Sequence, residues 1–185
     1  MSVGTTKSRL IVLRGPSGSG KTSTARQLRA RLGRGTAIVE QDQIRRVLLW
    51  ERDLPGNPSI ELIGLNARYA LDHGYDVIVE GIMSADRYGG MLRALTADHR
   101  GTTVHYFFDI PFEETVVRHA TRSWAHNVSA EMMRGWYEPG DLLPGVDQHV
   151  FDQYVEQDAV LARILTDLGL PVDLPVDPGA ISFGR

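Results

Sequence analysis

The segment from Gly15 to Thr22 constrains the fold of this chain more than any other. Its sequence, GPSGSGKT, fits the pattern G-x-x-x-x-G-K-[ST] at every fixed position. The apolar run RLIVLR precedes it at 9–14, and a segment with helical spacing of apolar residues follows at 21–32. Glycines let the backbone curl so that successive N–H groups point at one anion, and the helix adds its positive N-terminal end. The order strand, glycine loop, helix therefore predicts a phosphate-binding loop at the edge of a parallel sheet.

The polar residues of this loop predict its ligand. Lys21 is placed to reach the β- and γ-phosphates of a nucleotide, and the hydroxyl of Thr22 is placed to bind Mg²⁺. Lys21 and Lys7 are the only lysines among 20 basic side chains, all others being Arg. Arg replaces Lys easily in solvent but fits poorly between phosphates. We expect ATP and Mg²⁺ as cofactors, with nucleotide contacts from Gly15, Ser17, Gly18, Ser19, Gly20, Lys21 and Thr22.

Composition limits the remaining possibilities. A chain of 185 residues with 42% hydrophobic and 23% charged residues predicts one globular domain. The net charge of -3 gives no general attraction to nucleic acid or anionic lipid, and the lack of Cys excludes disulfides and thiolate chemistry. No apolar run approaches the roughly 18 residues of a membrane span. These observations predict a cytoplasmic protein that binds no membrane. They leave the oligomeric state open.

Short apolar runs alternate with longer segments of helical period, which is typical of an α/β fold with a parallel sheet. We expect a flexible N-terminal tail at 1–8, one domain at 9–170 and a Pro/Gly-rich tail at 171–185. The predicted strands are 9–14, 36–39, 75–80, 102–108 and 148–152. The predicted helices are 21–32, 42–50, 59–72, 85–97, 111 to about 126, 129–137 and 155–168.

Several nucleotide-binding classes share the phosphate loop, and the sequence argues against one of them. Guanine recognition in signalling GTPases uses Asn-Lys-x-Asp, but neither Lys follows an Asn here. The pattern D-x-x-G does occur, for example at Asp86 and at Asp98, and neither of these residues stands at the end of a predicted strand. A signalling GTPase is therefore not favoured.

Four further segments follow the phosphate loop in a characteristic order. They are VEQDQIR at 39–45, VIVEG at 77–81, PFEETVVRHATR at 111–122 and the closing segment 145–169. Together they resemble the P-loop kinases of small molecules and nucleic-acid ends, such as chloramphenicol phosphotransferases, gluconate-type kinases, zeta toxins and the kinase domain of polynucleotide kinases. The resemblance implies a three-layer fold similar to nucleoside monophosphate kinases. It would have five parallel strands, helices on both faces and a small helical lid at about 118–138.

The first of these segments contains a candidate catalytic acid. Asp42 lies just past the second predicted strand, at the sheet edge where open α/β sheets bind ligands. The resemblance implies that its carboxylate faces the acceptor hydroxyl, either as a base or as an orienting group. It also implies that Arg45, or its neighbour Arg46, holds an anionic part of the acceptor. The alternative is that Asp42 only caps the next helix.

The second segment ends in a candidate metal-site acid. Glu80 follows the apolar run of the third strand, and the resemblance implies that it holds Mg²⁺ directly or through water. The family more usually has Asp at this position, so direct ligation stays open. Glu80 could instead touch the acceptor or cap a loop.

The third segment contains two candidate lid arginines. A spacing of four places Arg118 and Arg122 on one helical face. The resemblance implies that both close over the nucleotide phosphates and offset the charge that develops on the transferred group. Glu114, four residues before Arg118, offers an ordinary surface ion pair as the alternative. The closing segment resembles the final β-α unit, whose loop borders the adenine.

The acceptor is the least determined part of the prediction. Arg87 is a candidate contact because its loop opens at the same sheet edge, while Trp124, Trp136 and Tyr137 could stack on an acceptor or belong to the core. We expect a kinase that phosphorylates a hydroxyl of a small molecule, such as an antibiotic, a sugar or a nucleoside-like metabolite. A 5′-hydroxyl polynucleotide kinase and a non-catalytic ATP-binding switch are the alternatives.

Overall fold

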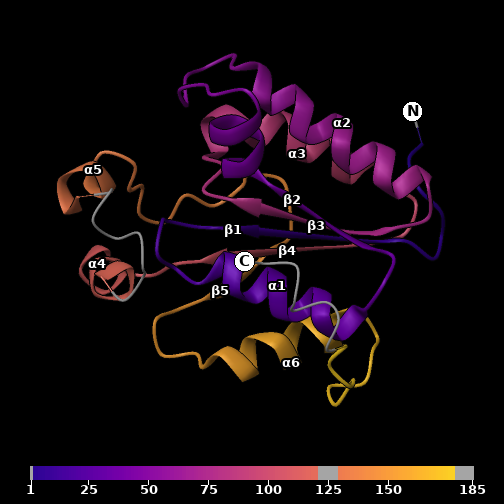
Figure 1. The fold of residues 1–185 in the computed structure, drawn as a ribbon. Helices are drawn as coiled ribbons and strands as arrows, with labels where there is room; N and C mark the ends of the chain where they lie inside the picture. The colour runs from indigo at the N-terminus through magenta and orange to yellow at the C-terminus, as the bar shows by residue number, and fades with distance from the viewer. Residues whose placement is uncertain (1, 121–128, 178–185) are drawn as a thin grey trace.

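The computed structural model describes residues 2–120 and 129–177 and has one five-stranded parallel sheet at its centre (Figure 1). The strand order is β2-β3-β1-β4-β5. The strands are β1 (Arg9–Arg14), β2 (Thr36–Glu40), β3 (Asp76–Gly81), β4 (Thr102–Phe108) and β5 (His149–Phe151). The predicted α/β fold with five parallel strands is confirmed.

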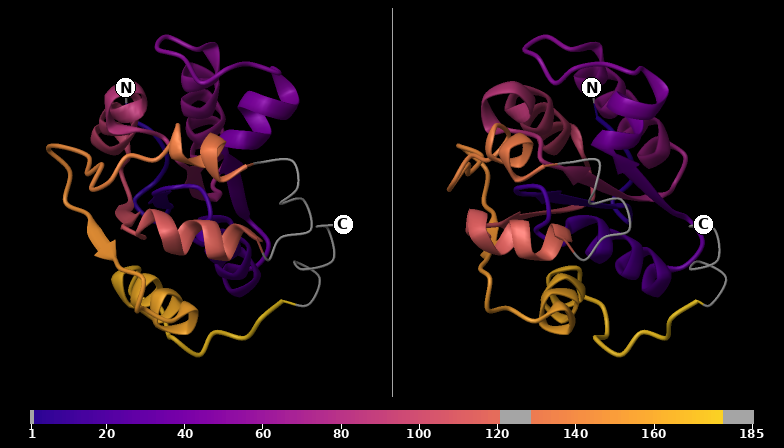
Figure 2. Two further views of the ribbon diagram at one scale, coloured as in Figure 1. Left: turned by 90° about the vertical axis from the view of Figure 1, so that its left-hand side faces the viewer. Right: turned by 60° about the vertical axis from the view of Figure 1, so that its left-hand side comes forward.

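Helices cover both faces of this sheet, which gives the three predicted layers. One face carries α1 (Lys21–Leu32) and α6 (Gln157–Asp167), and the other carries α2 (Pro58–Asp72) and α3 (Ala85–Asp98) (Figure 1). Two shorter helices, α4 (Phe112–Ala120) and α5 (Ala130–Arg134), lie together beyond the carboxyl ends of the strands (Figures 1 and 2). This places them over the edge where the predicted site residues converge.

The alternation of side chains along β1 explains why the fold has two cores. Leu10 and Val12 belong to the apolar cluster under α2 and α3, whereas Ile11 and Leu13 belong to the cluster under α1 and α6. Successive residues of a strand point to opposite faces, and a parallel sheet is covered on both. A continuous apolar run of this kind therefore becomes the central strand. It holds the phosphate loop rigidly at its carboxyl end.

The structure corrects two predicted segments. The helix predicted over 42–50 is present but shorter, and residues 43–48 form a π-helix, η1 (Gln43–Leu48). Its wide turn shows in the bond from the Leu49 N–H to the Ile44 carbonyl oxygen at 3.0 Å. The N-terminal segment was expected to be loose, but Val3 is buried and bridges in parallel to His99. Backbone hydrogen bonds from the Val3 N–H to the Asp98 carbonyl oxygen at 2.8 Å and from the Arg100 N–H to the Val3 carbonyl oxygen at 3.0 Å also hold this segment.

Within residues 2–120 and 129–177, every helix is too short or too polar to cross a lipid bilayer.

Candidate active site

The phosphate loop turns tightly between β1 and α1, and two of its glycines show why. Gly15 and Gly18 have φ of 141° and 83°, values that favour glycine. An added Cβ would lie 2.6 Å from the carbonyl oxygen of Phe108 at Gly15, and 2.6 Å from that of Thr115 at Gly18. The backbone of β4 and α4 therefore approaches the loop too closely for any side chain. The loop is shaped by its surroundings as well as by its own sequence.

Lys21 lies at the start of α1 and folds back across this loop. Its ammonium donates hydrogen bonds to the carbonyl oxygen of Pro16 at 2.7 Å and to Oγ of Ser19 at 3.1 Å. Both Lys21 and Ser19 are buried. Their contacts hold the ammonium over the backbone N–H groups that would surround a phosphate.

Thr22 and Glu80 meet at the same place from different elements. The Thr22 hydroxyl donates a hydrogen bond of 2.9 Å to Oε1 of Glu80, which is buried at the end of β3. Burial raises the pKa of Glu80, while the nearby charge of Lys21 and the hydrogen bond from Thr22 lower it. The net direction is upward. A nearby cation would therefore stabilise the ionised form of the Glu80 carboxylate.

This arrangement fits Mg²⁺ bound together with a nucleotide. Mg²⁺ prefers oxygen ligands and usually combines one or two protein oxygens with substrate phosphates and waters. Thr22 and Glu80 would supply the protein oxygens, and the loop N–H groups would supply the phosphate cradle. Within the described residues, no three His, Cys, Asp or Glu side chains gather in a way that could hold a metal without a nucleotide.

Asp42 lies just beyond β2, on the side of Glu80 away from the phosphate loop. Glu40 and Glu80 are register partners in the neighbouring strands, and the charge of Asp42 contributes to the raised pKa of Glu80. The Asp42 carboxylate is exposed and accepts ion pairs from Arg45 and Arg46, both at 3.0 Å. The π-helix presents both guanidiniums to one oxygen. Asp42 makes no side-chain hydrogen bond that caps that helix, so the capping alternative is not what the structure shows, while its catalytic role stays a prediction.

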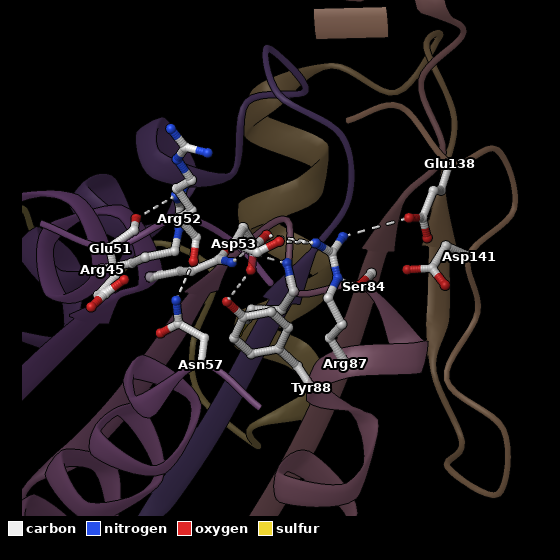
Figure 3. Close-up of polar contacts among 12 residues, drawn as sticks. Arg45, Glu51, Arg52, Asp53, Asn57, Ser84, Arg87, Tyr88, Glu138 and Asp141 are labelled. Atoms are coloured by element: carbon white, nitrogen blue, oxygen red, sulfur yellow. Dashed lines mark hydrogen bonds and ion pairs between the residues drawn. The ribbon is translucent and has the colours of Figure 1, made fainter. Parts of the chain in front are cut away.

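Arg87, on the first turn of α3, joins two segments that are distant in the sequence (Figure 3). Its Nη1 donates to the carbonyl oxygen of Asp53 at 2.6 Å and lies 3.3 Å from Oδ2 of the same residue. Nε donates to Oγ of Ser84 at 2.7 Å, and Nη2 lies 3.6 Å from Oε1 of Glu138. The predicted acceptor contact is therefore engaged by protein groups on every nitrogen.

A second ion pair crosses the same edge beside this network. Arg14, the last residue of β1, is buried and donates to Oδ2 of Asp141 at 2.7 Å and to the Met83 carbonyl oxygen at 2.8 Å. Asp141 also accepts from the N–H of Ala85 at 2.9 Å, which caps α3. The segment after α5 is thereby tied to the end of the central strand.

A family model described as an AAA domain matches residues 10–135 of this chain. The chain belongs to this family. The match spans the phosphate loop, Asp42, Glu80, Arg87 and the whole of α4. No curated protein sequence matches the chain.

Solved structures place this AAA domain among P-loop kinases by fold. The APS kinase CysC of Mycobacterium tuberculosis with AMPPNP and APS has a TM-score of 0.63 and 20% identity over 91% of this chain and 98% of its own. A gluconokinase from Sinorhizobium meliloti has a TM-score of 0.63 and 18% identity over 89% and 93%. A sugar kinase from Janibacter sp. has a TM-score of 0.66 and 21% identity over 91% and 99%. The predicted likeness is confirmed at the level of fold.

The described residues include only part of the predicted lid. Arg118 pairs with Oε1 of Glu114 at 2.7 Å, the surface alternative that the spacing offered, and also donates to the carbonyl oxygen of Gln153 at 3.1 Å. Arg118 therefore joins α4 to the loop after β5. Arg122 and Trp124 lie outside the described residues, so their predicted roles stay predictions. Tyr137 packs edge-on against Phe112, as part of a small apolar cluster.

Sequence reasoning missed Asp53, Glu138, Arg14 and Asp141. Arg14 carried a local signal, because a charge ended the apolar run of β1 directly before the phosphate loop. The three acids carried none, since each meets its arginine across 34 or more positions of the chain. Only the folded AAA domain brings them to one edge.

Proposed function

We propose that this protein is an ATP-dependent kinase that transfers the γ-phosphoryl group to a hydroxyl of a small-molecule acceptor. One observation carries the proposal. An exposed carboxylate, Asp42, stands within electrostatic reach of the buried Glu80 that bonds the phosphate-loop Thr22. A nucleotide-binding switch needs the loop and its metal-site acid but has no use for a second, exposed acid beside them. The kinase names of the similar structures support the same class.

The chemistry follows from the positions of these residues. The loop N–H groups and Lys21 would bind the phosphates, while Thr22 and Glu80 would hold the Mg²⁺ that neutralises their charge. Arg45 and Arg46 fix the Asp42 carboxylate, which would orient the acceptor hydroxyl and take its proton. As the hydroxyl oxygen bonds to the γ-phosphorus, the bond to the β-phosphate oxygen breaks and ADP leaves. Arg118 and Arg122 would offset the charge on the transferred group.

The first test is release of ADP from Mg-ATP across a panel of hydroxyl acceptors that includes sugars, nucleosides, aminoglycosides and a 5′-hydroxyl oligonucleotide. We expect stimulation by at least one small acceptor. Stimulation by the oligonucleotide alone would support the polynucleotide kinase instead. A lack of stimulation by every acceptor, with ATP still bound, would leave the ATP-binding switch.

A substitution separates the role of Asp42 from nucleotide binding. Asp42→Asn should lower kcat for transfer by roughly 10²- to 10⁴-fold, the usual contribution of a proton-accepting group. The Kd for Mg-ATP should stay within about threefold, because Asp42 lies on the acceptor side. Lys21→Ala is the opposite control and should lose nucleotide binding. Equal loss of transfer and ATP affinity in Asp42→Asn would make Asp42 structural.

A further inference from the structure

Asp53 is central to the acceptor side of the proposed site. It lies in the loop between η1 and α2, and one carboxylate serves three partners (Figure 3). Tyr88 donates a hydrogen bond of 2.7 Å to Oδ1, Arg87 lies 3.3 Å from Oδ2, and Nε2 of Gln41 reaches Oδ2 at 3.5 Å. Burial and the bond to Asp53 raise the pKa of Tyr88 to about 12. The tyrosine hydroxyl therefore remains a donor at any physiological pH.

Gln41 connects this carboxylate to the reacting edge. It is buried, it precedes Asp42, and its Oε1 accepts from the Met83 N–H at 3.1 Å. Its Cβ lies 2.5 Å from the point where a Cβ on Gly81 would be, and Gly81 follows Glu80. Asp53 is thus held against the ends of β2 and β3. Its charge therefore lies beside the ends of β2 and β3, where the proposed acceptor would bind.

The arginines beside these strand ends are matched by acids. Arg87 lies against Asp53 and Glu138, and Arg45 and Arg46 share Asp42. Arg52, on the same loop as Asp53, points away from the cluster toward solvent (Figure 3). An anionic acceptor would have to displace a carboxylate from a guanidinium, and the displaced acid would then stand unpaired beside the new negative charge. Neutral hydroxyls and amines meet no such penalty, because the carboxylates keep lone pairs to accept their N–H and O–H groups.

We propose that Asp53, by occupying Arg87, makes the acceptor site select neutral or cationic hydroxyl compounds over carboxylated, sulfated or phosphorylated ones. The inference rests on the proposed kinase function and names its acceptor class. Asp53 is a specificity-determining residue that acts through Arg87. Its removal opens an anion site on the same guanidinium.

The test uses sulfate as the anion and the full chain loaded with Mg-AMPPNP, so that the phosphate loop is already filled. Sulfate binding is titrated by calorimetry at constant ionic strength. In the wild-type protein, Arg87 should contribute nothing to sulfate binding, so Arg87→Gln alone should leave the titration unchanged. Asp53→Asn keeps an oxygen for Tyr88 and leaves the bond from Arg87 to the backbone carbonyl oxygen of residue 53, but it removes the negative charge paired with Arg87. This variant should bind sulfate at least about tenfold more tightly. The double variant Asp53→Asn with Arg87→Gln should lose that gain.

Two further variants serve as controls for the loss of charge and for the stability of Asp53→Asn. Asp86→Asn removes the same charge from the exposed position next to Arg87 and should leave sulfate binding unchanged. Glu138→Gln removes the charge of the other acid paired with Arg87, and it should give a smaller gain in sulfate affinity than Asp53→Asn. It replaces Asp53→Asn as the test if that variant folds poorly. Arg87-dependent sulfate binding by the wild-type protein would overturn the proposal. No gain in either Asp53→Asn or Glu138→Gln would overturn it equally.

The acceptor assay is a second, independent test. It compares two matched pairs of compounds: a hexose with its aldonic acid, and a nucleoside with its monophosphate. Wild-type protein should turn over the uncharged member of each productive pair at the higher kcat/KM. Asp53→Asn should move that ratio toward the anionic member by about tenfold or more. Preference of the wild-type protein for the anion would contradict the inference while leaving the kinase intact. Failure of every acceptor would reject the kinase, and the sulfate titration would still report on Arg87.

Discussion

At the scale of single residues, Glu80 shows a conflict between stability and the proposed function. It is buried beside Thr22, and burial raises its pKa. A raised pKa means that the folded state holds the proton more tightly than the unfolded state. The contribution to stability is then complete below the ordinary pKa of Glu, about 4.3, and is lost as the pH rises through the raised value. Above the raised pKa, the nucleotide-free protein therefore carries an unfavourable charge at Glu80.

Glu80→Gln should accordingly raise the Tm of the nucleotide-free protein at pH 8, and the gain should vanish near pH 4. The neutral amide still offers an oxygen to Thr22 but cannot attract a cation. The Mg²⁺ concentration needed for ATP binding should rise by roughly tenfold or more. Thermal unfolding between pH 4 and 8, with the exposed Glu61→Gln as the charge control, measures the first effect. A gain that persists unchanged at pH 4 would contradict the assignment.

At the scale of elements, the ends of β2 and β3 fix how Asp42 and Glu80 lie relative to each other. Gly81 ends β3, and its missing side chain leaves room for Gln41 just past β2. Gln41 is followed by Asp42, and the π-helix then turns Arg45 and Arg46 back onto that acid. A π-turn inside a helix is uncommon and occurs often at functional sites. The close approach of two strand ends therefore positions the candidate catalytic acid.

Gly81→Ala tests this close approach. The new Cβ would lie 2.5 Å from the Gln41 Cβ, so the end of β2 must shift, at a cost of about 1–3 kcal/mol in the free energy of unfolding. Transfer should fall more than ATP affinity, because the shift moves Asp42. Gly90→Ala, on α3 with open space around its Cβ, should instead stabilise by about 0.4–1 kcal/mol. Urea unfolding gives both values, and a Gly81→Ala variant as stable as the wild-type protein would refute the crowding.

At the scale of the whole molecule, the ion pair of Arg14 and Asp141 joins the central strand to a segment 127 positions away. The side chain of Arg14 is 2% exposed and that of Asp141 is 16% exposed. Burial is the largest influence on both pKa values, lowering that of Arg14 and raising that of Asp141. Each charge is therefore tolerated mainly because the other is present. The pair ties the segment after α5 to the carboxyl end of β1.

Breaking this pair from one side should be costly. Asp141→Asn keeps an acceptor for the Ala85 N–H but leaves Arg14 buried without its counter-ion, so stability should fall by about 3 kcal/mol. Adding Arg14→Met removes the stranded charge and should recover a large part of that loss. A double-mutant cycle measures this coupling. It compares the free energies of unfolding, from chemical denaturation, of the wild-type protein, both single variants and the double variant. Additive losses in the double variant would show that the two side chains do not depend on each other.

The sequence by itself determined the phosphate loop, the parallel α/β sheet and the positions of Asp42, Glu80 and Arg87 at its carboxyl edge. These follow from local patterns, since apolar runs, glycines and helix starts act over a few neighbouring residues. The tertiary structure alone decided that Arg87 is already paired with Asp53 and Glu138, and that Arg14 is paired with Asp141. The net charge at a site depends on which side chains meet there. Residues far apart in the chain leave no periodic signal of meeting, so only folding reveals that Arg87 and Arg14 are matched by acids.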